Sequence, residues 1–84
     1  MNKGILYFSA PWCQPCKTFG PILESAVNQK RIGLKKINID YDVNFVEKYN
    51  VQSVPTIILT DGAGNEQKRL IGSKSLEEVI NFIG

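Results

Sequence analysis

Apolar residues form one short run near the start of the chain and then recur at helical spacing. The run Ile5-Leu6-Tyr7-Phe8 is continuous, which is typical of a strand buried on both faces, as in a parallel sheet. Pro11 ends this strand. The next segment, from Cys16 to about Lys30, predicts a helix. Its apolar residues are Phe19, Ile22, Leu23, Ala26 and Val27. Pro21 lies inside this helix and is expected to kink it.

The middle of the chain predicts a second strand and a short helix. The strand follows Gly33, and its apolar residues are Leu34, Ile37 and Ile39. Asp40-Tyr41-Asp42 supplies turn and N-cap chemistry for the helix. The apolar residues that this helix carries are Phe45, Val46 and Tyr49.

The last third predicts a hairpin and a helix. Val54 to Thr60 is a β-prone run opened by Pro55, and the turn cluster 61–65 joins it to a strand from Glu66 to Ile71. We expect these two strands to be antiparallel, with Gly72 ending the second. Ser75 and Glu78 form a capping box for the final helix. Its apolar positions are Leu76, Val79, Ile80 and Ile83.

The predicted order is β-α-β-α-β-β-α, an α/β fold in one domain over residues 1–84. With a right-handed crossover at each β-α-β step, it gives a parallel pair extended by an antiparallel hairpin. The mixed sheet then has four strands, with helices on both faces.

Composition excludes several function classes. The net charge is only +2 and the lysines are scattered, so nucleic acid is not an expected partner. No stretch reaches the roughly 20 apolar residues of a membrane span, and we see no signal peptide. We therefore expect a cytoplasmic protein. The chain has no histidine, which excludes Ser-His-Asp and Cys-His hydrolases and every zinc site that contains histidine.

Two cysteines, Cys13 and Cys16, follow the first predicted strand and open the first helix. A helix N-terminus lowers the thiol pKa and favours the reactive thiolate. Cys13 should sit in the turn, with Cys16 one helical turn further in and more buried. In this scheme Cys13 attacks a substrate disulfide and Cys16 resolves the mixed disulfide. A structural disulfide is rare in the cytoplasm, and a metal site would need more ligands.

The residues around the cysteines suit this chemistry. Pro15 pre-sets the helix start, Trp12 offers a flat apolar surface, and Lys17 places a positive charge nearby, directed to solvent.

The chain resembles the thioredoxin family over nearly its whole length. The matching segments are Trp12-Cys13-Gln14-Pro15-Cys16-Lys17, Pro21-Ile22-Leu23, Lys36-Ile37-Asn38-Ile39-Asp40, Val54-Pro55-Thr56 and Gly72. The resemblance implies a cis Pro55 packed beside the cysteines, and a Val54 backbone that pairs with an extended substrate peptide. Thr56 belongs to the same substrate-binding loop, and Gly72 lines the groove. It also implies protein disulfides as substrates and no bound cofactor or metal. Electrons would come from NADPH through thioredoxin reductase, and the protein would act as a monomer in redox homeostasis.

The chain departs from the family pattern at three places. The usual first strand and helix are missing, so the chain is close to glutaredoxin in length. Gln14 replaces the usual glycine and leaves the redox potential open. Tyr7 stands where the family has a buried aspartate that helps to deprotonate the second cysteine, and a phenol is a poor base at neutral pH. We expect Tyr7 to be core packing with a bonded hydroxyl. We expect Lys36, which would pair with that aspartate, to be solvated.

Three other functions compete with a protein-disulfide reductase. A glutaredoxin-like enzyme using glutathione fits the size, but Trp12, Lys17 and the Ser73 that follows Gly72 argue against it. An adaptor module with the same fold would not need the cysteine pair. An oxidant or isomerase would use the pair in the reverse direction.

Overall fold

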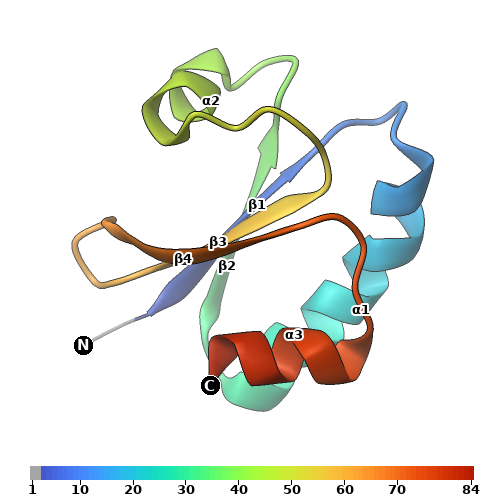
Figure 1. Cartoon of the computed structure of the whole chain (residues 1–84), viewed down its shortest axis with the longest axis vertical. Helices are drawn as coiled ribbons and strands as arrows, with labels where there is room; N and C mark the ends of the chain where they lie inside the picture. The colour runs from blue at the N-terminus through green and yellow to red at the C-terminus, as the bar shows by residue number, and fades with distance from the viewer. Residues whose placement is uncertain (1–2) are drawn as a thin grey trace.

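The computed structural model describes residues 3–84. Its centre is a four-stranded sheet in the order β2-β1-β3-β4 (Figure 1). The strands are β1 (Gly4–Ser9), β2 (Gly33–Asn38), β3 (Thr56–Thr60) and β4 (Glu66–Ile71). Strands β1 and β2 are parallel, whereas β1 with β3 and β3 with β4 are antiparallel. The mixed four-stranded sheet is therefore confirmed. A right-handed crossover was expected at both β-α-β steps. This was wrong for the second step, from β2 to β3, because β3 runs antiparallel to β1 and therefore also to β2.

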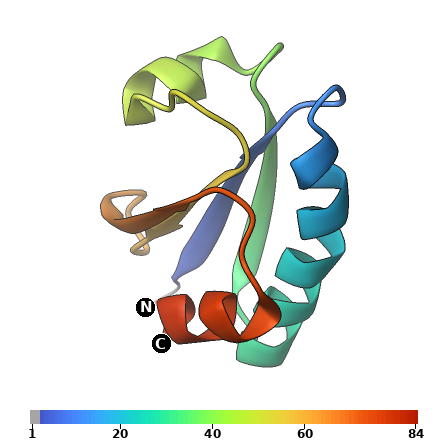
Figure 2. The ribbon, with the colours of Figure 1, turned by 45° about the vertical axis from the view of Figure 1, so that its right-hand side comes forward.

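Helices lie on both faces of the sheet, as the sequence predicts. They are α1 (Gln14–Lys30), α2 (Val43–Tyr49) and α3 (Leu76–Ile83). Helices α1 and α3 lie together on one side, and α2 lies on the other (Figures 1 and 2). The sheet therefore separates two apolar cores.

Strand β1 supplies both cores because its side chains alternate between the faces. Ile5 and Tyr7 join the core under α1 and α3. Leu6 and Phe8 join the core under α2. All four side chains are buried, which confirms the strand that is buried on both faces. The end of β1 is consequently a rigid platform for the cysteine loop that follows it.

Two helix starts differ in how they are capped. The Ser75–Glu78 capping box at α3 is confirmed, with Glu78 N donating to Ser75 Oγ and Ser75 N to the Glu78 carboxylate. Asp42 does occupy the N-cap of α2, but its side chain makes no bond to that helix. It instead accepts from the backbone N–H of Asn38, at 3.2 Å, because the β2–α2 turn brings that donor within reach.

The third strand begins two residues later than predicted, at Thr56 rather than Val54. The Val54–Pro55 peptide bond is cis, so the chain turns there and enters the sheet only afterwards. Val54 is left beside the cysteine loop, where it packs against the cysteine cluster, and Pro55 is fully buried.

Candidate functional site

The two cysteines lie where the chain passes from β1 into α1. Cys13 is the N-cap residue of α1, with an extended backbone at φ −88° and ψ 107°. Cys16 lies in the first turn, and the two residues are joined by a disulfide with their Cα atoms 5.3 Å apart. Pro15 also lies in this turn, where a missing N–H costs nothing. The local geometry thus allows the pair to close with no rearrangement of the helix.

Helix α1 provides the electrostatic environment of Cys13. The backbone N–H of Cys16 donates to Cys13 Sγ at 3.2 Å. When the disulfide is reduced, a thiolate at this position would accept the same N–H and face the positive end of the helix dipole. Lys17 adds a positive charge and is exposed, as expected.

The expectation that Cys16 is more buried than Cys13 was wrong, because both are 5% exposed. The cysteines form a small apolar cluster with Ala10, and Ile39 and Val54 pack against it. Those two residues come from the end of β2 and from the loop before β3. They pack against the cysteine cluster from outside α1, so the helical spacing of the cysteines does not reveal them.

Trp12 is the large apolar side chain exposed beside the cysteines, with 64% of its surface accessible. Its indole N–H donates to the Asp40 carboxylate at 3.2 Å, which fixes the ring orientation. A pocket of about 330 Å³ opens next to the ring. Its other lining residues are Ile39, Val46, Val51, Gln52, Ser53 and Val54. Gln14 and Pro15, which lie between the two cysteines, are exposed.

The loop that carries Val54 and Pro55 is held from two sides. Gly72 N donates to Pro55 O at 2.8 Å, and Gly72 has a positive φ of 94°, which glycine adopts without strain. The Thr56 hydroxyl is turned inward and donates to Ser53 O at 2.8 Å. Thr56 therefore supports the loop with its side chain and does not present that side chain to a substrate.

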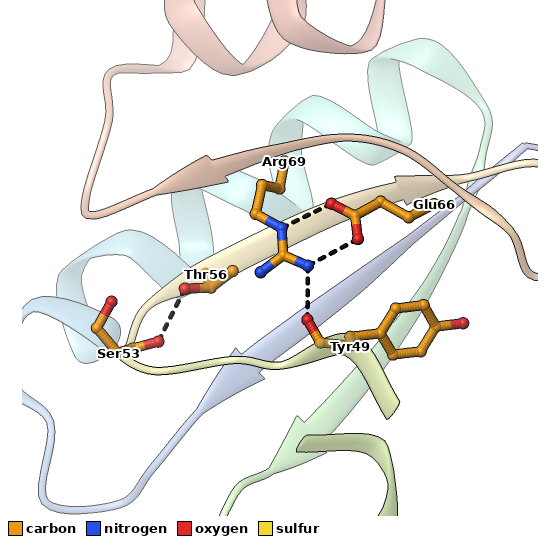
Figure 3. Close-up of polar contacts among 5 residues, drawn as sticks. All are labelled: Tyr49, Ser53, Thr56, Glu66 and Arg69. Carbon is orange, nitrogen blue, oxygen red and sulfur yellow. Dashed lines mark hydrogen bonds and ion pairs between the residues drawn. The ribbon is translucent and has the colours of Figure 1, made fainter. Parts of the chain in front are cut away.

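An arginine on β4 ties the start of this loop to the sheet (Figure 3). Arg69 donates to Tyr49 O at 2.6 Å. The Glu66 carboxylate accepts from the same guanidinium at 2.6 and 2.7 Å. This pairing lowers the pKa of Glu66. Because Tyr49 is the last residue of α2, the contact anchors the segment that leads to Val54.

Tyr7 lies beneath the cysteines on the α1 side of the sheet. It is 4% exposed, and its hydroxyl donates to Cys16 O at 3.0 Å. This confirms the packing interpretation with a bonded hydroxyl. Burial raises the pKa of Tyr7, and the nearby Glu24 charge raises it further. Tyr7 is therefore a protonated donor at neutral pH.

Lys36 is not simply solvated, which corrects the expectation. Its ammonium group donates to Glu24 on α1 at 2.9 Å, although the side chains remain 60% and 50% exposed. Sequence reasoning missed Glu24. Its spacing could have identified it, because Glu24 lies eight residues after Cys16 and therefore on the same face of the helix.

An open pocket of about 510 Å³ connects these groups. It is lined by Tyr7, Ser9, Ala10, Pro11, Cys16, Lys17, Gly20, Glu24, Lys36 and Asn38. The Cys16 side of the disulfide therefore faces polar and charged groups.

Replacing Tyr7 by phenylalanine should remove the bond to Cys16 O and little else. We expect stability to fall by about 1 kcal/mol, the usual net value of one hydrogen bond. Disulfide reduction should stay within a few fold of the wild-type rate, since the phenol is not a base. Urea unfolding and a turnover assay measure the two effects. Tyr41→Phe is the matched control, because Tyr41 is 81% exposed. A loss of several hundredfold in activity with the fold intact would contradict the packing role.

Within residues 3–84, no group of three Cys, Asp or Glu side chains is placed to hold a metal ion. Over the same residues, no helix combines the length and the apolar character that a bilayer crossing requires.

Comparison with known proteins gives a consistent result. A family model described as thioredoxin matches residues 1–84. The thioredoxin of Chlamydia pneumoniae is 43% identical over 77 residues, which cover 90% of this chain and 74% of that protein. A bifunctional thioredoxin reductase/thioredoxin of Mycobacterium leprae is 40% identical over 76 residues, covering 87% of this chain and 16% of that protein.

The fold is also shared with solved structures. A mutant thioredoxin from Halobacterium salinarum NRC-1 superposes with a TM-score of 0.90 at 26% identity. The match covers 98% of this chain and 72% of that chain.

Proposed function

The chain belongs to the thioredoxin family and is a thiol–disulfide oxidoreductase, and from that premise we propose that it reduces disulfide bonds in other proteins. The observation that carries this proposal is the position of Cys13. Its sulfur lies at the N-cap of α1 and accepts the Cys16 N–H, beside an exposed tryptophan.

The reaction proceeds in two exchanges. In the reduced protein the Cys13 thiolate attacks one sulfur of a substrate disulfide, and the other substrate sulfur leaves as a thiolate. Cys16 then attacks Cys13 in the mixed disulfide and releases the second substrate thiolate. The product is the Cys13–Cys16 disulfide, which is the state in the structure. Two electrons have passed to the substrate.

Substrate recognition combines a backbone contact with an apolar one. An extended peptide pairs with the backbone of Val54, as a strand added next to Pro55 and Gly72. The Trp12 ring packs over the residues that flank the substrate cysteine. Every group involved comes from one chain, which supports action as a monomer.

NADPH supplies the electrons through a thioredoxin reductase, and the chain itself holds no cofactor. The fused reductase and thioredoxin of Mycobacterium leprae supports this pairing. The pair must return to the dithiol after each turnover, which favours a reducing compartment such as the cytoplasm.

Recharging distinguishes this function from a glutathione-dependent one. Reduction of a protein disulfide is followed with bacterial thioredoxin reductases and NADPH, or with glutathione and its reductase, each with a blank that lacks the protein. We expect repeated turnover only with thioredoxin reductase. Turnover with glutathione alone would instead identify a glutaredoxin-like enzyme.

A further inference from the structure

The second exchange requires that Cys16 lose its proton. A free thiol is mostly protonated at neutral pH, and only the thiolate is an effective nucleophile. Cys16 is 5% exposed, and it lines the open pocket of about 510 Å³ beneath the disulfide. A group that lines this pocket can take up the proton.

The charged and titratable groups of that pocket come from three elements. Strand β1 contributes Tyr7, strand β2 contributes Lys36, and α1 contributes Lys17 and Glu24 beside Cys16 itself. Tyr7 uses its proton to bond Cys16 O, and the Lys36 ammonium group is a donor to Glu24. Among the residues that line the pocket, Glu24 is the one carboxylate.

The face of α1 between Cys16 and Glu24 is open. Cys16, Gly20 and Glu24 follow one another at intervals of four residues and so lie on one side of the helix. Gly20 has no side chain there, and a Cβ at this position would lie 3.9 Å from the Tyr7 hydroxyl. Eight residues of helix span about 12 Å, and helical side chains lean towards the N-terminus. The remaining gap suits a short chain of water molecules.

Lys36 holds the carboxylate over this opening. Its ammonium group lies 2.9 Å from Glu24 Oε2 and reaches across from the neighbouring strand. Half of the Glu24 side chain is exposed, so a proton that arrives there can pass directly to solvent.

We propose that Glu24 is the proton acceptor for Cys16, through water in the pocket that Gly20 leaves open. This inference rests on the proposed function. As Cys16 Sγ attacks Cys13 Sγ, the S–H bond breaks and the proton passes through water to the Glu24 carboxylate. The Cys13–Cys16 bond forms, and the bond from Cys13 to the substrate sulfur breaks. The substrate leaves as a thiolate that is protonated by solvent, and Glu24 returns its proton to solvent.

Glu24→Gln tests this assignment, because glutamine keeps the size of the side chain and an oxygen for Lys36. Removal of an exposed ion pair changes stability little. The reduced protein is mixed with a disulfide-linked peptide, quenched with acid at successive times and analysed by mass spectrometry. The mixed disulfide is then followed as it forms and as it decays. Glu47→Gln on α2 is the matched control, since Glu47 is exposed and lies outside the pocket.

We expect formation of the mixed disulfide to be unchanged in Glu24→Gln and its decay to slow by roughly 100-fold, a typical contribution of a general base. Glu24→Asp should recover most of the rate, and Glu47→Gln should match the wild type. The pH profile should also change. Between about pH 6 and 8 the decay should depend less on pH in the wild type than in Glu24→Gln, because proton transfer to a general base does not require a preformed thiolate. The decay in Glu24→Gln should rise with pH, as the thiolate fraction does.

Equal decay rates in Glu24→Gln and Glu47→Gln, with parallel pH profiles, would overturn the assignment and leave the two-step exchange intact. If the wild type does not convert the disulfide-linked peptide to its free thiols at all in this time course, the proposed function itself fails. The same time course therefore separates the two failures.

Discussion

Replacing Cys16 by serine is expected to leave the protein covalently attached to its substrate. Cys13 keeps its N-cap position and the N–H of residue 16, so its attack on a substrate disulfide should proceed. A serine hydroxyl does not resolve the mixed disulfide, because an alcohol stays protonated and is a poor nucleophile towards sulfur. Turnover should fall to the uncatalysed rate while the mixed disulfide accumulates. Non-reducing electrophoresis and mass spectrometry detect the adduct.

Cys13→Ser is the matched variant and should behave differently. It also loses turnover, but it should trap no adduct, because the N–H that would stabilise a thiolate at the start of α1 is directed to the sulfur of residue 13 and not to that of Cys16. If Cys13→Ser accumulates the adduct and Cys16→Ser does not, the order of the two cysteines is reversed.

Phe19→Ala should cost about 3–5 kcal/mol in the free energy of unfolding. Phe19 is fully buried on the face of α1 that packs against the sheet. Its ring meets Tyr7 edge to face, with centroids 6.0 Å apart and planes at 71°. Truncation removes this contact and leaves a cavity between α1 and β1. Small domains have only about 5–15 kcal/mol of stability in total, so the variant should be close to unfolding at room temperature.

Urea unfolding followed by far-ultraviolet circular dichroism measures this loss. Tyr41→Ala is the control, since Tyr41 is 81% exposed and surface substitutions usually change stability by less than about 0.5 kcal/mol. A loss for Phe19→Ala as small as that of the control would mean that α1 shifts and closes the cavity.

The features that the sequence predicted well depend on neighbours along the chain. The run Ile5–Phe8 forms strand β1, which is buried on both faces. A continuous apolar run predicts this, because successive side chains point to opposite faces of the sheet. Ser75 and Glu78 formed their capping box, because both partners lie within one helical turn. The position of Cys13 at the start of α1 also followed from local order, a strand, then a turn, then a helix.

The features that were missed depend on segments that meet only in the folded molecule. Cys13 is as buried as Cys16, because Ile39 and Val54 pack against the cysteine cluster. Ile39 comes from the end of β2 and Val54 from the loop before β3. Glu24 meets Lys36 across the gap between α1 and β2. The distance between Glu24 and Lys36 is set by how α1 packs on the sheet, so no hydrophobic periodicity within α1 or β2 predicts it.

Strand β1 lies in the interior of the sheet, and this has a consequence for synthesis on the ribosome. Gly4 pairs with Gly33 on one side and with Thr60 on the other, and Thr60 Oγ1 donates to Gly4 O. Strand β1 therefore gains its β3 neighbour only after the 56 residues that separate Gly4 from Thr60 have been made. Until then its edge has unpaired backbone groups and its apolar side chains lack cover. The cysteine loop that follows β1 therefore gains its full support only after β3 has left the ribosome and paired with β1.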